Sequence, residues 1–147
     1  MSKSLLVIPD QHAEDGFDND RADFLSKYII DTKPDIVVNI GDAADMTSLS
    51  SYDKGKRSFQ GKSYAKDIQA HLDFQDRVWA PVKSKKKKMP DRYFFLGNHC
   101  QRIERALDLS PELAGTVGYD DLQLEDYYNE VIWYDGDTPG IKIIEGI

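Results

Sequence analysis

Three short polar segments of this chain carry side chains that could bind metal ions and act on a phosphate ester. The segments are Asp10-Gln11-His12, Gly41-Asp42-Ala43-Ala44-Asp45 and Gly97-Asn98-His99. They offer carboxylate, imidazole and amide ligands without a thiolate, a set that suits Mn, Fe, Zn or Mg ions. A carboxylate such as Asp42 can bridge two ions, and two ions can activate a water and stabilise the oxygens of a phosphate. The segments therefore predict a site for two divalent metal ions.

Each polar segment follows an apolar run that predicts a buried β-strand. The runs are Leu5-Leu6-Val7-Ile8, Ile36-Val37-Val38-Asn39-Ile40 and Tyr93-Phe94-Phe95-Leu96. Residues 20–32 have apolar side chains at helical spacing, with Asn19 or Asp20 as an N-cap, so the first two strands are expected to be parallel neighbours. In an open α/β sheet, ligands bind at the carboxyl ends of the strands. We therefore expect the three segments to meet at one edge of the sheet.

The other segments predict the remaining elements of an α/β fold. Residues 46–62 are polar and predict an exposed loop, whereas residues 63–79 predict a helix that Pro81 ends. A further helix is expected to begin near Cys100. Two more strands are expected at 131–134 and 141–144, joined by a turn at Asp135-Gly136-Asp137.

The three motifs, taken in order, resemble the calcineurin-like metallophosphoesterase superfamily. Its pattern is D-x-H, then G-D-x-x-D or -H, then G-N-H-D or -E, followed by a later histidine and a final G-H-x-H. The resemblance runs from about residue 3 to residue 105. It implies an α/β fold in which a mixed β-sheet sandwich is flanked by helices, with metal ions at the strand ends. Residues 1–147 are expected to form a single domain equivalent to the N-terminal part of that fold.

The resemblance also implies a role for each matching residue. The positions that match metal ligands are Asp10, His12, Asp42 and Asn98. Asp42 would bridge two divalent ions, Mn²⁺ in the first place and Fe, Zn or Mg as alternatives, and a metal-bound water would attack the phosphate. His99 would protonate the leaving oxygen, and Asp45 would orient His99, since a carboxylate fixes the tautomer of an imidazole.

The chain departs from the family pattern in two places. Cys100 stands where an acidic residue usually follows Asn-His, outside the expected ligand set. No histidine follows His99, so the second metal site is expected to be incomplete. Two alternatives to an active enzyme therefore stay open. The chain is a C-terminally truncated, non-catalytic binding or structural module, or it is half of a site that a second copy or another chain completes.

The expected substrate is a phosphodiester of a nucleic acid or nucleotide. Met46-Thr47 stands where protein phosphatases usually carry Arg-Gly, which argues against a protein substrate. Arg102 could contact a substrate phosphate, or form a surface ion pair with Asp120 or Asp121. The compact organisation is also similar to phosphoesterases encoded by bacterial viruses.

Two groups of basic residues allow more than one interpretation. The lysines between residues 83 and 88 could contact a nucleic-acid backbone, or belong to a solvated loop. The basic and aromatic residues of the preceding loop could touch substrate or lie on a mobile surface, and they are Tyr52, Lys54, Lys56, Arg57 and Phe59. His71 is expected to be a surface or partly buried histidine without a role in the site.

The composition is that of a soluble globular protein, with 40% hydrophobic and 31% charged residues. A net charge of -7 makes the chain a poor general match for nucleic acid, although bound metal ions would reverse the local field. The single cysteine excludes an internal disulfide. We expect a cytoplasmic protein, because the sequence lacks a signal peptide and its longest apolar runs, of about six residues, are too short for a bilayer.

Overall fold

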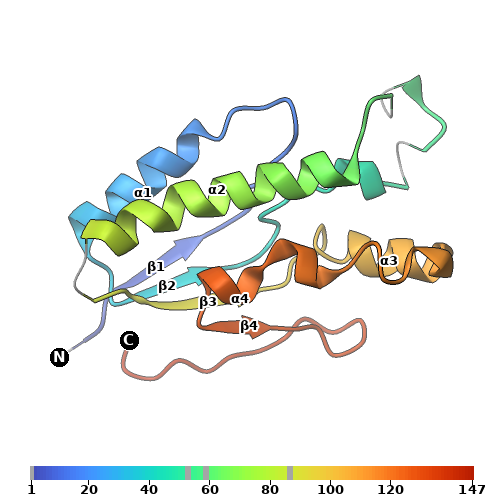
Figure 1. Cartoon of the computed structure of the whole chain (residues 1–147). Coiled ribbons are helices and arrows are strands. Elements are labelled where there is room, and N and C mark those ends of the chain that lie inside the picture. The colour runs from blue at the N-terminus through green and yellow to red at the C-terminus, as the bar shows by residue number, and fades with distance from the viewer. Residues whose placement is uncertain (1, 52–53, 58–59, 86–87) are drawn as a thin grey trace.

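A single parallel β-sheet forms the centre of the protein. The computed structural model describes residues 2–51, 54–57, 60–85 and 88–147. The four strands lie side by side in chain order (Figure 1), and they are β1 (Leu5–Ile8), β2 (Ile36–Asn39), β3 (Asp91–Phe95) and β4 (Glu130–Ile132). Every neighbouring pair is parallel, so the expectation of a mixed sheet is wrong. Each connection is long enough to carry the chain back to the same end of the sheet, which parallel pairing requires.

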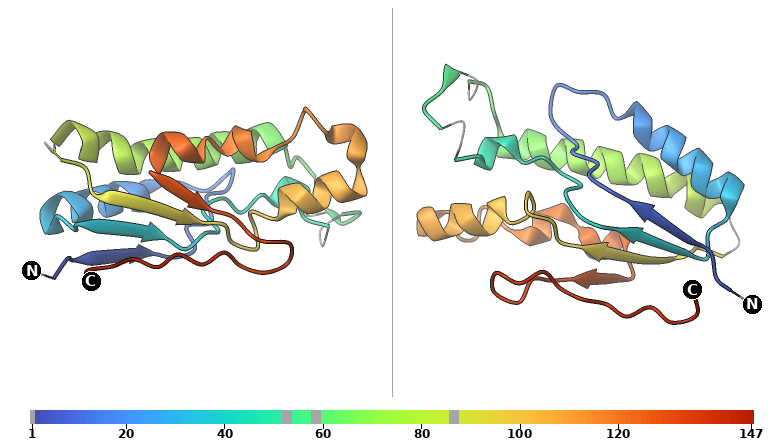
Figure 2. Two further views of the ribbon diagram at one scale, coloured as in Figure 1. Left: turned by 90° about the horizontal axis from the view of Figure 1, so that it is seen from below. Right: turned by 180° about the vertical axis from the view of Figure 1, so that it is seen from behind.

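The helices α1, α2 and α4 cover one face of this sheet (Figure 2), as expected when successive right-handed crossovers join neighbouring strands. The α-helices are α1 (Asp20–Thr32), α2 (Tyr64–Lys85), α3 (Arg102–Leu109) and α4 (Leu124–Tyr127). Short 3₁₀ helices are η1 (Thr47–Leu49), η3 (Pro111–Leu113) and η4 (Tyr119–Leu122). The arrangement confirms an α/β fold with helices beside a parallel sheet.

The hydrophobic core lies between the sheet and α2. Phe74 and Val78 of α2 and Phe94 of β3 are buried, and Tyr128 packs against the rings of both Trp79 and Phe94. Each fully buried side chain of this size contributes about 1.5–3 kcal/mol. The core therefore fixes the sheet against the longest helix and sets where the strand ends lie.

His71 is also part of this core, so the expectation of a surface or partly buried histidine is wrong. It has no exposed surface, and its Nε2 lies 2.9 Å from the carbonyl oxygen of Leu122. Burial lowers the pKa of His71 to about 4, and the hydrogen bond to that carbonyl only partly opposes the shift. His71 is therefore a neutral core residue near neutral pH.

Helix α2 extends beyond the predicted end at Pro81. It continues to Lys85 with Pro81 inside, so Lys83 and Lys85 are helical and the prediction of a loop for them is wrong. Proline removes one backbone hydrogen bond and disturbs the preceding turn. Here Val82, which has no exposed surface, packs into the core, and its burial offsets part of that cost.

The N-terminus of α1 begins where the sequence predicts, but the end is stabilised differently. Asn19 occupies the N-cap position without capping the helix through its side chain. Its amide instead donates to the carbonyl oxygen of Ala70 and to the carboxylate of Asp73 on α2. On α1 itself, Phe24 and Tyr28 are exposed, whereas Ile29 is buried.

The polar segment after β2 is less exposed than predicted. Met46, Thr47 and Ser50 are buried, and η1 forms one turn between them. Tyr52 and Phe59, which the sequence suggested as substrate contacts, lie outside the described residues.

The face of the sheet opposite the helices carries little cover. Leu5 and Val7 of β1 are exposed on it. The strand predicted at 141–144 does not form: that segment has no regular structure, and Ile141 and Ile143 are more than four-fifths exposed. A second sheet, which a sandwich requires, is therefore absent from the described part of the chain. Among those residues, every helix is too short or too polar to cross a membrane.

Candidate metal centre

The loops that follow β1 and β2 are joined to each other beyond the ends of the strands. His12 donates its amide to the carbonyl oxygen of Asp42 at 2.9 Å, and Ala13 donates to Ala43 at 2.8 Å. Asp45 donates back to the carbonyl oxygen of Ala13 at 3.0 Å. These bonds continue the parallel pairing past the sheet, so the first two predicted ligand segments run side by side.

Three of the predicted ligands have left-handed backbone conformations. The φ angles are 34° at Asp10, 46° at His12 and 54° at Asp42. Residues other than glycine adopt such angles at a cost, and backbone strain of this kind gathers at functional sites. The strain here falls on the residues that the motifs single out.

Two glycines allow the third loop to reach the second. Gly41 has a φ of 97°, and a Cβ at this position would overlap the backbone of Gly97. A Cβ on Gly97 would in turn overlap the carboxylate and the amide nitrogen of Asp42. Glycine at both positions is therefore required for the close approach of the loops after β2 and β3.

The converging loops place ligand atoms of Asp10, His12 and Asp42 within 4.8 Å of one another. Asn98 lines the same pocket of about 450 Å³ as Asp10 and Asp42. One oxygen of the Asp42 carboxylate accepts the amide hydrogen of His99 at 2.7 Å, which fixes its orientation. Two carboxylates and one imidazole form a donor set that fits a hard or borderline divalent cation.

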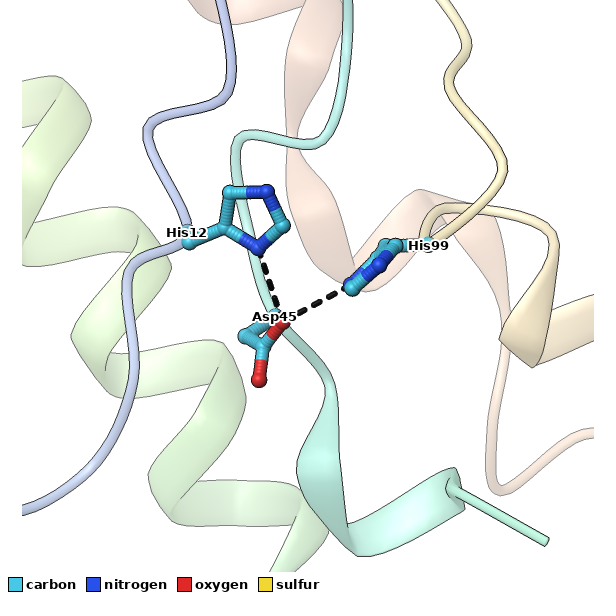
Figure 3. Close-up of side chains that lie close together, drawn as sticks. All are labelled: His12, Asp45 and His99. Carbon is cyan, nitrogen blue, oxygen red and sulfur yellow. Dashed lines mark hydrogen bonds and ion pairs between the residues drawn. The ribbon is translucent and has the colours of Figure 1, made fainter. Parts of the chain in front are cut away.

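Asp45 lies between two histidine rings (Figure 3). Its Oδ1 is 2.8 Å from Nδ1 of His12 and 2.7 Å from Nδ1 of His99. The His12 contact has the alignment of a hydrogen bond, whereas His99 approaches as an ion-pair partner, its Nδ1 having no aligned acceptor. The two imidazoles also meet edge to face, with centroids 4.5 Å apart.

The surroundings of Asp45 favour its charged form. Burial alone would raise the pKa of this carboxyl, but the hydrogen bond from His12 and the nearby His99 and Arg102 outweigh it and hold the pKa below the usual value. An ionised Asp45 can accept from Nδ1 of His12, which leaves Nε2 of that ring free to bind a metal ion.

A second group of possible ligands was not predicted from the sequence. Side-chain atoms of His12, Asp45 and His99 also lie within 4.8 Å of one another. His12 therefore belongs to both groups, and Asp45 and His99 could bind a metal ion themselves. No sequence pattern predicts this group, because residue spacing does not determine which ring atoms face each other.

Arg102 contacts the site rather than the acidic residues suggested from the sequence. Its guanidinium donates to the carbonyl oxygen of Asp45 at 2.5 Å and lies 4.0 Å from the carboxylate of the same residue. Asp121 instead accepts from the hydroxyl of Tyr64 and the amide of Gly118. The surface ion pair with Asp120 or Asp121 is therefore wrong for Arg102.

A buried polar network under the ligand loops was also missed. Gln11 Oε1 accepts from the amides of Asn39 and Gln75, both at 3.1 Å. The Tyr128 hydroxyl accepts from Asn39 at 3.0 Å and donates to Gln75 at 2.8 Å. Asn39 Oδ1 accepts from the amide of Gly41 at 2.9 Å. The network thus ties the loop that holds Asp10 and His12 to the loop that holds Asp42.

One clue to this network was present in the sequence. Asn39 interrupts the run of β-branched residues in β2, and a buried amide in a central strand needs partners. Cys100, by contrast, is buried and has its thiol pKa raised by that burial, so it is not a ready nucleophile.

Comparison with protein-family models, curated proteins and solved structures finds nothing that matches this chain.

Proposed function

We propose that this protein is a metal-dependent phosphoesterase. The proposal rests on one observation: the left-handed backbone at Asp10, His12 and Asp42 brings their ligand atoms within 4.8 Å of one another. Strained residues that converge as a cation-binding set are hard to explain by the needs of the fold alone. The motif resemblance adds the reaction class, which the geometry by itself does not name.

The first metal ion would be held by Asp10, by His12 through Nε2, and by Asp42, and Asn98 would contribute to a second ion beside it. When bound, the ions would supply Lewis acidity to the phosphate and lower the pKa of a water. Asp42 keeps one oxygen on the amide of His99, so its other oxygen can face an ion. Asp45 holds the His12 ring in the orientation that this arrangement needs.

His99 is the proposed acid for the leaving oxygen. Asp45, 2.7 Å away, would orient the ring, and the hydrogen bond from His12, together with the nearby His99 and Arg102, holds the pKa of Asp45 below its usual value. Protonation of the leaving oxygen by a positioned acid accelerates such reactions by about 10²–10⁴-fold.

A phosphodiester of a nucleic acid or nucleotide is the proposed substrate. The pocket at Asp10, Asp42 and Asn98 is partly lined by Ile40 and Tyr134, which suits a substituent larger than a hydroxyl. The guanidinium of Arg102 adds positive charge beside the site in a chain whose net charge is -7.

Hydrolysis of bis(4-nitrophenyl) phosphate by the purified chain with Mn²⁺ tests the function. The variant Asp42→Asn keeps the volume and an acceptor for His99, and it is expected to lose both turnover and Mn²⁺ binding. Asp35→Asn is the matched control, because Asp35 also accepts from a backbone amide but lies at the amino ends of the strands. Turnover that survives in Asp42→Asn, or that needs no metal ion, would refute the proposal.

The second group of ligands favours one alternative, a metal-binding module without catalysis. If His12, Asp45 and His99 hold the ion, His99 is a ligand and no longer an acid. Calorimetry with Mn²⁺ on His99→Ala separates the two functions. The enzyme keeps its affinity and loses turnover, whereas the module loses affinity.

A further inference from the structure

A groove lies directly beside the candidate metal centre, between η1 and α3. It has a volume of about 420 Å³, and its walls include Leu49, Ser50, Arg102, Arg105, Ala106 and Leu109. Arg102 is the link to the metal centre, because its guanidinium also donates to the carbonyl oxygen of Asp45. Arg102 therefore lies between the groove and Asp45 of the candidate metal centre.

The groove contains two guanidinium groups from one helix face. Arg102 and Arg105 are three residues apart on α3, a spacing that places side chains next to each other. Asp108 also lines the groove, yet within the described residues no ion pair or hydrogen bond joins it to either arginine. The Arg105 side chain is exposed and forms no hydrogen bond or ion pair in the same part of the chain, whereas its backbone amide donates to the carbonyl oxygen of Gln101. Arg102 already lies 4.0 Å from the carboxylate of Asp45, so Arg105 is the charge that favours an anionic ligand in the groove.

Apolar side chains line another part of the groove, beside Ser50 and Ser51. Leu49 and Ala106 are partly buried in its wall, and Leu109 at the end of α3 is 74% exposed. A ligand that combines a phosphate with an apolar body would pair with Arg105 and cover these side chains. A nucleotide has this composition, since every base presents an apolar face beside a charged phosphate.

We propose that the groove between η1 and α3 binds the nucleotide adjacent to the scissile phosphodiester, with Arg105 on its phosphate and Leu109 against its sugar or base. The inference rests on the proposed function and narrows its substrate to an oligonucleotide. A free mononucleotide carries the same groups, so the experiment must compare a linked with an unlinked ligand.

The first measurement compares two substrates in the presence of Mn²⁺. One is a thymidine dinucleotide with a 5′-phosphate, and the other is bis(4-nitrophenyl) phosphate, which has no second phosphate. Arg105→Ala is expected to lower kcat/KM for the dinucleotide relative to the aryl diester by about tenfold, mainly through KM, because one charge-assisted hydrogen bond is lost. Lys85→Ala removes an exposed charge at the other end of the sheet and should leave this ratio unchanged. An unaltered ratio in Arg105→Ala overturns the inference.

The second measurement is independent of catalysis. Fluorescence anisotropy of a labelled short oligothymidylate in EDTA reports binding without hydrolysis. Arg105→Ala should weaken binding about tenfold and Leu109→Gln about threefold, and an excess of thymidine monophosphate should compete less well than the unlabelled oligonucleotide. Both substitutions are at exposed positions, so we expect neither to impair folding. If neither substrate is hydrolysed, the proposed function is refuted. The anisotropy measurement still tests whether the groove binds a nucleotide. Equal affinities of wild type and both variants, or stronger competition by the mononucleotide, overturn it.

Discussion

The two ends of the parallel sheet carry pockets of equal size, about 450 Å³ each, but their chemistry differs. The pocket at the carboxyl ends is lined by Asp10, Asp42 and Asn98. The pocket at the amino ends is lined by lysines from separate parts of the chain, and they are Lys3, Lys33, Lys85 and Lys88. The volume of a pocket therefore does not locate the chemistry in this molecule.

Backbone conformation separates the two ends more clearly. Lys33 at the amino end has a φ of 52°, but it ends α1, and its amide donates to the carbonyl oxygen of Ile29 as at many helix ends. The left-handed residues at the carboxyl end, Asp10, His12 and Asp42, end no helix. Strain that no local structure requires, placed on the predicted metal ligands, is what distinguishes the candidate site.

The two ends also use their carboxylates differently. Asp35 accepts from the amide and the hydroxyl of Ser4 at 2.8 and 2.9 Å, and these bonds, the amide's first, hold its pKa below the usual value. Asp42 accepts one amide, from His99 at 2.7 Å. Asp35 thus joins two segments of the fold, whereas Asp42 is oriented by the fold with one oxygen left for a ligand.

Gly97→Ala provides the largest test of this difference. The added methyl group would overlap the carboxylate and amide of Asp42, so we expect a loss of about 3 kcal/mol in the free energy of unfolding, together with loss of Mn²⁺ binding. Urea denaturation measures the first effect and calorimetry the second. Gly118→Ala, where a Cβ meets nothing within 4 Å, should change neither. A normal Gly97→Ala protein would mean that the loops after β2 and β3 are not packed as described.

Much of the fold followed from the pattern of apolar residues. The runs at β1, β2 and β3, each ended by Pro9 or a polar segment, predicted strands correctly. Only β2 is buried along its whole length as expected, because Leu5 and Val7 of the edge strand β1 are exposed. The segment 141–144 has the same composition but forms no strand. Composition gives β-propensity, whereas a strand also needs a partner to complete its hydrogen bonds.

The candidate site was predicted from the sequence only in part. Motif spacing indicated the positions of Asp10, His12 and Asp42, because the carboxyl ends of parallel strands share one edge. It did not indicate that Asp45, expected to orient His99, would also contact His12, or that Gln11 and Gln75 would meet under the loops. The first contact depends on how the loops after β1, β2 and β3 converge, and the second on how α2 packs against the sheet.

The pH dependence of stability tests the hydrophobic core that contains His71. The pKa of His71 is 6.5 in the unfolded chain and about 4 in the folded one, so the unfolded state binds the extra proton between these values. Stability should therefore fall by roughly 3 kcal/mol as the pH drops from 6.5 to 4, and level off below. Asp45, whose pKa is lowered by folding, would add a further loss only as the pH falls below 3.8.

Urea denaturation across this pH range measures the effect of His71. His71→Gln, which keeps a donor for the carbonyl oxygen of Leu122, should flatten the curve between pH 6.5 and 4. Should that variant not fold, NMR titration of the wild-type ring decides the same question. A ring that titrates near pH 6.5 would contradict the buried neutral histidine.

Asn39→Ala tests whether the buried network holds the two ligand loops together. It removes one of the two donors to Gln11 Oε1 and the side-chain acceptor of the Gly41 amide, so we expect a loss of about 2 kcal/mol in stability and a loss of about 10–100-fold in Mn²⁺ affinity. Ser4→Ala removes the two bonds of the Ser4 hydroxyl to Asp35 at the amino end and should leave Mn²⁺ affinity unchanged. Equal Mn²⁺ affinity in Asn39→Ala and Ser4→Ala would mean that the buried network does not position the predicted metal ligands.

Lys33→Ala and Lys85→Ala give the smallest expected effects and the sharpest check on the amino end. Both side chains are exposed, and neither has an ion-pair partner among the described residues, so each change should alter stability by less than about 0.5 kcal/mol. Turnover of bis(4-nitrophenyl) phosphate and Mn²⁺ affinity should equal those of the wild type. The lysines complement the C-terminal ends of α1 and α2, and this modest electrostatic role accounts for their positions. A large drop in turnover with either variant would mean that the two ends of the sheet act together, and the division between a structural and a chemical end would then be wrong.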